Sequence, residues 1–517
     1  MGKLDKYLAA VLLLLLVPAA GAVTTYDIRL HGDSADINVT VELYPEVQGR
    51  DVRLSTTWLL PENTDVGSVS DSEGPIRDYE VSGNRVRFET LIEEDENREV
   101  VEIHGRIEDV RKDEYRGLDR VQLQLSGFRD SRPEVPEEVT QVHVESDRSI
   151  LAESHSFGFN TSLRNRSVKY AGTGPLNLQM SVSGGGESYD HFQLFGTGNL
   201  STADDLYWLP AAVTGFIPQV NRWPVVVYPD EVYDSKVDRW SAGQYRRGGV
   251  IFVRNSTLQS NEGPAVVLHE VMHGFNEQAL QWTTATRSWF DEGTASYVEW
   301  LVNEKRGVRQ AEIFGEEVSW VEGNTRYTLP PRKEPGDLWD YYSEGRTYMR
   351  GWTLFNTTVD RTFGYAYSEL LIRRYVMENG PASLRDVYSG LLDLNSRYNR
   401  TVEDVGESNQ AILDVMNASF RPCYSSEREE VFDCLERVHE MEAKIPELGD
   451  VEDRTGKVRI RKVKPPEEGL VQKDNGNAAE ERNQSPANTT MEPRTGFWKE
   501  LFELLNSILQ RLERFLF

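Results

Sequence analysis

Cysteine, lysine and histidine are scarce in this sequence of 517 residues. With only two cysteines, Cys423 and Cys434, the chain is not a disulfide scaffold, although the pair could close one small loop or remain free buried thiols. Lysine supplies 13 of the 57 basic residues, and 84 acidic residues leave a net charge of −27. An acidic surface of this size repels phosphate, which argues against nucleic acid as a partner. The imbalance fits an ordinary acidic exported protein or one adapted to concentrated salt.

One nearly unbroken apolar run stands near the N-terminus, at residues 7–19. It follows Lys3 and Lys6 and precedes the small residues Ala20-Gly21-Ala22, an order that is typical of a secretory signal peptide. We therefore expect residues 1–22 to be cleaved off, with an uncleaved anchor helix as the alternative. The mature protein would be secreted or displayed on the extracellular cell surface, either free or associated with the membrane.

Asn-x-Ser/Thr sequons agree with export and predict a glycoprotein. The ten sequons begin at Asn38, Asn160, Asn165, Asn199, Asn255, Asn356, Asn399, Asn417, Asn483 and Asn488.

Residues 23–188 are predicted to form an all-β sandwich. Apolar and polar residues alternate in the segments 36–43, 84–88 and 121–125, which is the period of a strand with one buried face. Turn residues separate the runs, and the region has no convincing long helix. Short antiparallel strands of this kind close most naturally into two packed sheets.

Residues 189–448 have a different pattern, which predicts an α+β domain with a mostly helical C-terminal part. Two apolar segments, 225–228 and 250–253, are typical of buried strands. Helical periodicity then dominates. The expected helices cover residues 264–281, 290–304, 365–377 and 408–420.

The last part of the chain is predicted to be a flexible linker and a short helix. Residues 449–495 contain few large apolar side chains and cannot bury enough surface to offset the entropy of ordering. Residues 496–517 form an amphipathic pattern with interspersed charges, so they are not a transmembrane span. This helix could lie on a membrane surface, pair with a partner helix, or dock on the folded domain.

The segment His269-Glu270-Val271-Met272-His273 is the strongest chemical signal. It lies in a helical pattern with Pro264 in the first turn. Histidines at positions i and i+4 share one helical face, so both imidazoles can bind a single zinc ion. Glu270 points about 100° away, where it can reach a metal-bound water as general base. By chance alone, an ordinary surface helix would show this pattern in on the order of one such chain in a hundred.

Two further features strengthen the metal hypothesis. Glu292 follows His273 with 18 residues between them, a distance that lets a second helix return and supply the third zinc ligand. Glu299 is two turns beyond Glu292 and could orient a ligand histidine, or it could be an ordinary solvated carboxylate. A tyrosine near the metal could stabilise an oxyanion. Tyr348 is the candidate, with Tyr341 and Tyr342 as competitors.

Together these residues resemble the gluzincin zinc metallopeptidases, and specifically the M1 aminopeptidase family. That family combines His-Glu-x-x-His, 18 residues, a Glu within an Asn-Glu-Gly-[FL]-Ala-x-Tyr-like stretch, and a later Tyr-x-Lys-Gly motif. The counterparts here are Asp291-Glu292-Gly293-Thr294-Ala295-Ser296-Tyr297 and Tyr348-Met349-Arg350-Gly351, and the resemblance covers mainly residues 240–380.

The resemblance implies a thermolysin-like catalytic domain, residues 189–448, behind an N-terminal β-domain. It implies one zinc ion held by His269, His273 and Glu292, with Glu270 and Tyr348 as catalytic residues. The expected activity is that of an exported zinc metallopeptidase, which hydrolyses peptide or protein substrates with a metal-activated water.

One family motif is missing. Family aminopeptidases carry Gly-x-Met-Glu-Asn, whose Glu binds the amino group of the substrate, but the corresponding residues 245–252 contain neither Glu nor Asn. Both aminopeptidase and endopeptidase activity therefore stay open. The alternative from another class is a catalytically inactive surface binding module with a metallopeptidase fold, and a non-peptide hydrolase is a third interpretation.

Overall fold

The computed structural model describes most of the chain between residues 22 and 453. The described residues are 22–44, 49–125, 139–237, 239, 241–285, 287–307, 319–322, 325–328, 349, 352–353, 358–398, 400–447 and 452–453. Apart from Ala22 and the strand β24 (Glu452–Asp453), the predicted signal peptide, linker and C-terminal helix lie outside these residues.

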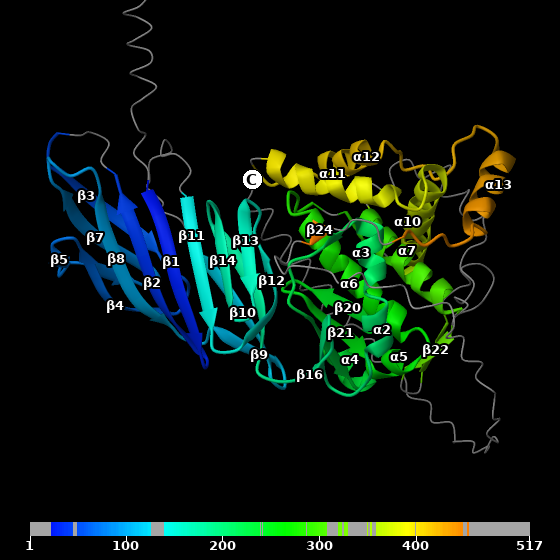
Figure 1. Ribbon diagram of the computed structural model, residues 1–517, viewed down its shortest axis with the longest axis horizontal. Coiled ribbons are helices and arrows are strands. Elements are labelled where there is room, and N and C mark those ends of the chain that lie inside the picture. Colours follow the sequence, from blue (N-terminus) through cyan, green and yellow to red (C-terminus); the bar gives the residue numbers. More distant parts are fainter. Residues whose placement is uncertain are drawn as a thin grey trace, which may run out of the picture. The chain divides into compact units, whose positions relative to one another are not determined.

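Three sheets make up the N-terminal region (Figure 1). The largest has the order β13-β14-β11-β1-β2-β8-β4-β5, in which only β1 and β11 run parallel. Its strands are β1 (Ala22–His31), β2 (Ser34–Leu43), β4 (Thr64–Asp71), β5 (Gly74–Pro75), β8 (Glu99–Ile107), β11 (Val139–Ser146), β13 (Phe159–Arg164) and β14 (Ser167–Thr173). The second sheet consists of β12 (Ser149–His155), β15 (Leu176–Ser183), β10 (Leu118–Leu125) and β9 (Arg111–Tyr115). The third consists of β3 (Val52–Leu59), β7 (Arg85–Ile92) and β6 (Glu80–Ser82).

One hydrophobic core is shared by these three sheets. Alternation along β2 buries Ile37, Val39 and Val41 on the same face, as the sequence pattern predicts. Trp58 of the third sheet and Leu178 of the second belong to the same buried cluster. The sheet-rich character of residues 23–188 is therefore confirmed.

The second region combines a mixed sheet with many helices. The sheet has the order β16-β17-β19-β21-β20, with β20 at one edge and antiparallel to β21. Its strands are β16 (Glu187–Ser188), β17 (Phe192–Phe195), β19 (Trp223–Tyr228), β20 (Gly243–Arg246) and β21 (Val250–Arg254). Two small pairs, β18 (Phe216–Ile217) with β24 and β22 (Ser319–Glu322) with β23 (Thr325–Thr328), complete the strands of the described residues.

Helices dominate the later part of this region, as predicted. They are α2 (Ser201–Asp205), α3 (Trp208–Thr214), α4 (Asp230–Lys236), α5 (Asn255–Gln259), α6 (Gly263–Ala279), α7 (Ser288–Arg306), α10 (Thr358–Asn379), α11 (Ser383–Arg397), α12 (Val405–Met416) and α13 (Arg428–His439). The predicted helices at 264–281, 290–304 and 365–377 correspond to α6, α7 and α10. The helix expected at 408–420 is displaced: α12 starts at Val405, where Asp404 caps it, and ends before Asn417, which takes a left-handed conformation.

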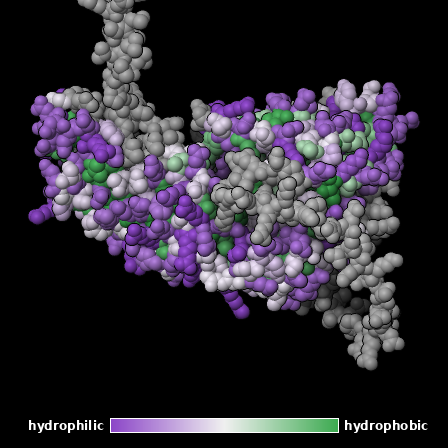
Figure 2. All heavy atoms as spheres, viewed as in Figure 1, coloured by the Kyte–Doolittle hydropathy of each residue, from purple (hydrophilic) through white to green (hydrophobic). Residues whose placement is uncertain are grey.

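The described surface is mainly hydrophilic on the face shown in Figure 2, in keeping with the acidic composition. Among the described residues, no helix is long and apolar enough to span a membrane.

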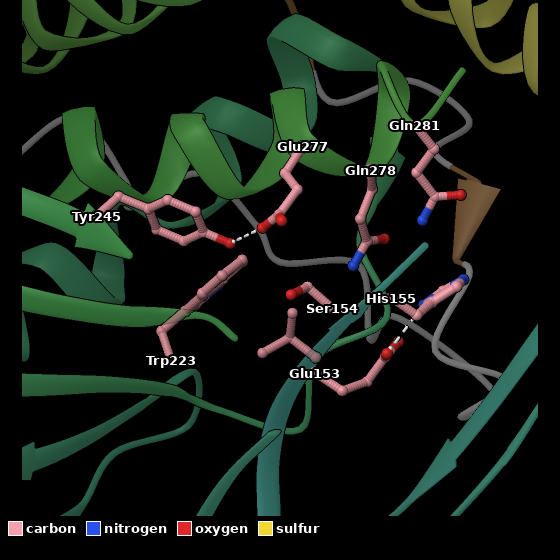
Figure 3. Close-up of a pocket in the computed structure, with 9 residues that line it drawn as sticks. Glu153, Ser154, His155, Trp223, Tyr245, Glu277, Gln278 and Gln281 are labelled. Carbon is pink, nitrogen blue, oxygen red and sulfur yellow. Dashed lines mark hydrogen bonds and ion pairs between the residues drawn. The ribbon is translucent and has the colours of Figure 1, made fainter. Parts of the chain in front are cut away.

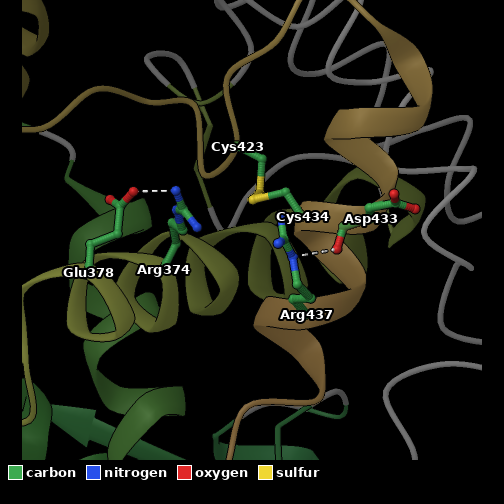
Figure 4. Close-up of a disulfide and its surroundings, with 6 residues drawn as sticks. All are labelled: Arg374, Glu378, Cys423, Asp433, Cys434 and Arg437. Atoms are coloured by element: carbon green, nitrogen blue, oxygen red, sulfur yellow. Dashed lines mark hydrogen bonds and ion pairs between the residues drawn. A yellow bond between two sulfur atoms is a disulfide. The ribbon is translucent and has the colours of Figure 1, made fainter.

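Cys423 and Cys434 form a disulfide, which settles the choice between a bridge and free thiols (Figure 4). The bridge connects the segment after α12 to α13, and both cysteines belong to the buried core of the helical region. The expected small loop is thus present, with a sequence separation of 11.

Replacing both cysteines with serine should lower the free energy of unfolding by about 3 kcal/mol, the amount expected for a loop of this length. The cause is the greater entropy of an unfolded chain that lacks the cross-link. Thermal unfolding of the double variant tests this, and wild-type protein under reducing conditions should match the variant. An unchanged melting temperature in both samples would contradict the prediction.

Candidate metal centre

The two histidines of the motif lie one turn apart on α6, and α7 packs alongside with Glu292 facing them. The His269 and His273 ring centroids are 5.1 Å apart. Glu292 Oε2 lies 3.4 Å from His269 Nε2 and 3.7 Å from His273 Nε2. One ligand atom from each of the three residues falls within 4.8 Å of the others, so the trio could hold a metal ion. The structure brings together the three residues that the sequence selects as ligands.

The donor set fits a zinc ion. Two imidazoles and one carboxylate are typical of a catalytic zinc site, which leaves the fourth tetrahedral position for water. Glu292 Oε2 is buried and has no hydrogen-bond partner among the described residues, so it needs a cation or donor to compensate for its burial. The Nδ1 atoms of both histidines are paired with other carboxylates, and each Nε2 atom faces Glu292.

Each histidine is held by a second carboxylate. His269 Nδ1 lies 3.0 Å from Glu299 Oε2, and His273 Nδ1 lies 3.1 Å from Asp291 Oδ1. Such pairs fix the tautomer and orientation of a ligand imidazole. For Glu299, this contact favours the ligand-orienting alternative over that of an ordinary solvated carboxylate. Asp291 was not predicted for this role, although it directly precedes Glu292 in the motif.

Asp291 is itself held in place by a buried network. Asn276 Nδ2 donates to Asp291 Oδ1 at 2.8 Å, and the Tyr388 hydroxyl donates to Asn276 Oδ1 at 2.5 Å. Helix α11 thereby supports the metal centre through α6. A satisfied chain of this kind restricts the rotamers of its members.

Removing either carboxylate should weaken zinc binding. We expect Asp291→Asn and Glu299→Gln each to lower zinc affinity by about 10–100-fold, the range for partners of ligand histidines. Competition with a fluorescent chelator measures this. Exposed Glu304 on the same helix provides the control, because Glu304→Gln should leave the affinity unchanged. Wild-type affinity in both Asp291 and Glu299 variants would contradict the prediction.

The carboxylates also determine the protonation of the metal-free site. Burial lowers the pKa of His269, but the carboxylates of Glu292, at 3.4 Å, and Glu299, at 3.0 Å, outweigh it and hold that pKa well above its usual range. Burial lowers the pKa of His273 as well, yet the charges of Glu292 and Asp291 raise it to about 9. The site therefore favours positive charge, whether from protons or from a metal.

Zinc affinity should consequently rise with pH. A zinc ligand must be a neutral imidazole, so below the His273 pKa of about 9 the ion must displace a proton from that ring. Each displaced proton costs about tenfold in apparent affinity for each pH unit below the pKa. Calorimetric titrations in buffers of different ionisation enthalpy should show proton release at pH 7. Affinity that is constant from pH 6 to pH 9 would contradict the assignment.

Glu270 lies beside the trio but is not part of it. Only 6% of the residue is exposed, and burial raises the pKa of its carboxyl group above the usual value. The neighbouring imidazoles of His269 and His273 lower this pKa, and the charge of Glu292 raises it further. Tyr348, the predicted oxyanion donor, and its competitors Tyr341 and Tyr342 lie outside the described residues.

No family model and no curated protein matches this sequence. Solved structures are similar to it at low identity. An M1 zinc metallopeptidase from Deinococcus radiodurans has 13% identity and a TM-score of 0.31, with 83% of this chain and 96% of that chain covered. Aminopeptidase A from Legionella pneumophila, in complex with aspartic acid, has 11% identity and a TM-score of 0.33, with 77% and 48% covered. Leukotriene A4 hydrolase from Saccharomyces cerevisiae has 12% identity and a TM-score of 0.30, with 83% and 68% covered. These similarities are remote.

Proposed function

We propose that this chain is an exported zinc-dependent peptidase. The observation that carries the proposal is the convergence of His269 Nε2, His273 Nε2 and the buried Glu292 Oε2, with the buried carboxyl group of Glu270 between the two histidines in α6. A site that only held a structural metal would have no need of this additional acid.

Bound to these three residues, one zinc ion would supply Lewis acidity for the scissile carbonyl and for the attacking water. Glu270 takes the proton of that water and passes it to the leaving amine, for which its raised pKa is suited. Tyr348 would donate a hydrogen bond to the developing oxyanion. His269 and His273 are kept in the required tautomer by Glu299 and Asp291.

A peptide substrate can be bound by the edge strand β20, which runs beside α6 at the margin of the five-stranded sheet. Pairing of an extended peptide with a sheet edge supplies main-chain hydrogen bonds without selecting a sequence. The residues that would anchor a substrate amino group in family aminopeptidases are missing here, so internal cleavage is compatible with the site.

The proposal includes the arrangement of the chain. A signal peptide, residues 1–22, precedes a β-domain, residues 23–188, and a thermolysin-like peptidase domain, residues 189–448. A linker, residues 449–495, then leads to an amphipathic helix, residues 496–517, which could attach the enzyme to a membrane surface or a partner helix.

The test is zinc analysis combined with a cleavage profile. The purified mature chain should contain about one zinc ion and cut a mixed peptide library, with products identified by mass spectrometry. Loss of single N-terminal residues would define an aminopeptidase, and internal cuts an endopeptidase. Zinc binding with no cleavage across the library would overturn the proposal in favour of a binding module.

A further inference from the structure

We propose that strand β20 positions Glu270, and that Gly243 leaves the space in which the Glu270 side chain lies. The proposal deepens the function proposed above, because it gives the general base a positioning element outside its own helix. Gly243 and Tyr245 are two residues apart on β20, so they face the same side of the strand. Both residues contact α6: Gly243 lies beside Glu270, and Tyr245 binds Glu277.

Gly243 lies directly against the general base. A Cβ atom at this position would lie 2.9 Å from both Cγ and Oε1 of Glu270 and 3.0 Å from Val266 Cγ1. Contacts this short force a side chain to move. The backbone of Gly243 is not in the left-handed region, so a larger residue could adopt its conformation. The requirement for glycine is therefore one of space beside Glu270, and not one of backbone geometry.

Tyr245 connects strand β20 to helix α6 at a second position. Its hydroxyl donates to Glu277 Oε2 at 2.5 Å, and its backbone N–H lowers the pKa of the Glu270 carboxyl group. Figure 3 shows the Tyr245 side chain reaching Glu277 on α6, with Trp223 beneath the ring. Glu277 is seven residues, about two helical turns, beyond Glu270. The strand thus contacts the helix at the general base, through Gly243, and again two turns later, through Tyr245.

The strand also packs closely against the helix at a third position, Gly274. A Cβ atom on Gly274 of α6 would lie 2.3 Å from the Trp223 ring and 3.2 Å from Tyr245 Cε2, so the helix surface is in direct contact with both rings. After β20, the Gly248 carbonyl accepts a hydrogen bond from the Ser181 hydroxyl at 2.7 Å. Because β20 is held at several points, its contacts with Glu270 restrict the direction of that carboxylate.

The experiment uses Gly243→Ala in the mature chain loaded with zinc. We expect kcat to fall about 100-fold, the effect of a displacement of roughly 1 Å in a reacting group, while KM and zinc content stay within twofold of wild type. In the Glu270→Gln background the same change should cause no further loss, because the residue acts through Glu270. A crystal structure of the Gly243→Ala variant should show the Glu270 carboxylate displaced. Tyr245→Phe is the second variant. It removes only the hydroxyl group, so it should disturb the fold less than Gly243→Ala, and it should lower kcat about tenfold.

Gly67 provides the matched control. It is a strand glycine of β4, where a new Cβ would meet nothing closer than 3.6 Å, so Gly67→Ala should keep wild-type kcat. The positioning proposal is overturned if Gly243→Ala leaves Glu270 in place in the crystal, or if Gly243→Ala lowers activity equally with and without Glu270. A wild-type protein that cleaves no peptide would refute the proposed function instead, and the crystal structure would still decide whether Gly243 positions Glu270.

Discussion

Glu270→Gln should abolish nearly all peptidase activity and leave zinc binding intact. Glutamine has almost the same shape as glutamate but cannot accept the proton of the attacking water. General base catalysis contributes about 10²–10⁴-fold in rate, and this group also returns the proton to the leaving amine, so we expect a loss of about a thousandfold in kcat. Zinc content should stay at the wild-type level, because Glu270 is not one of the three grouped ligands.

The measurement is peptide turnover at saturating substrate together with zinc content of the same sample. Glu262→Gln is the control, since Glu262 is exposed at the start of α6 and its charge lies away from the buried motif. It should retain wild-type activity. A Glu270→Gln enzyme that still turns over robustly would remove Glu270 from the role of general base.

The metal trio could be predicted from the sequence because its geometry is mostly local. Histidines four residues apart on a helix share a face whatever the rest of the chain does. Glu292 required only that the second helix return, and an 18-residue connection leaves few other places for it. The zinc-ligand interpretation thus depends on α6 and α7 alone, and both helices formed close to the expected limits.

Contacts that depend on tertiary packing could not be predicted in the same way. Whether Asp291 or another residue meets His273 Nδ1 depends on how α7 crosses α6, since one residue of rotation along a helix moves a side chain by about 100°. The contact between Gly243 and Glu270 joins residues 27 positions apart through the placement of a whole strand. Glycine in a strand pattern indicates a close approach in general terms, but not its partner.

The end of a helix was likewise harder to predict than the helix itself. The pattern 408–420 indicated a helix, but not that Asn417 would leave the helical conformation and end α12 early. Asparagine tolerates the left-handed region better than most residues, so it was the available signal for that end. The packing of the following segment, which carries Cys423, against α13 depends on the disulfide and the core, and neither appears as periodicity.

Glu292→Gln should remove zinc and activity together, in contrast to Glu270→Gln. Glutamine keeps the volume of Glu292 but removes the negative charge that faces both histidine Nε2 atoms. We expect the affinity for zinc to fall by more than about a hundredfold, beyond the range for partners of ligand histidines, and turnover to disappear at micromolar zinc. The exposed Glu304→Gln variant on the same helix should behave as wild type.

Thermal unfolding separates loss of the ligand from damage to the fold. In the metal-free protein at pH 7, the Glu292 carboxylate compensates the charge of His269 and His273, whose pKa values it raises, so its replacement should lower the stability modestly. Adding zinc at about 100 times its dissociation constant should stabilise the wild-type protein by about 2.7 kcal/mol but leave the variant unchanged. Equal stabilisation of both proteins by zinc would place the ion elsewhere. A variant that unfolds far below the metal-free wild type would mean that Glu292 supports the packing of α7, and its loss of activity would then say nothing about metal binding.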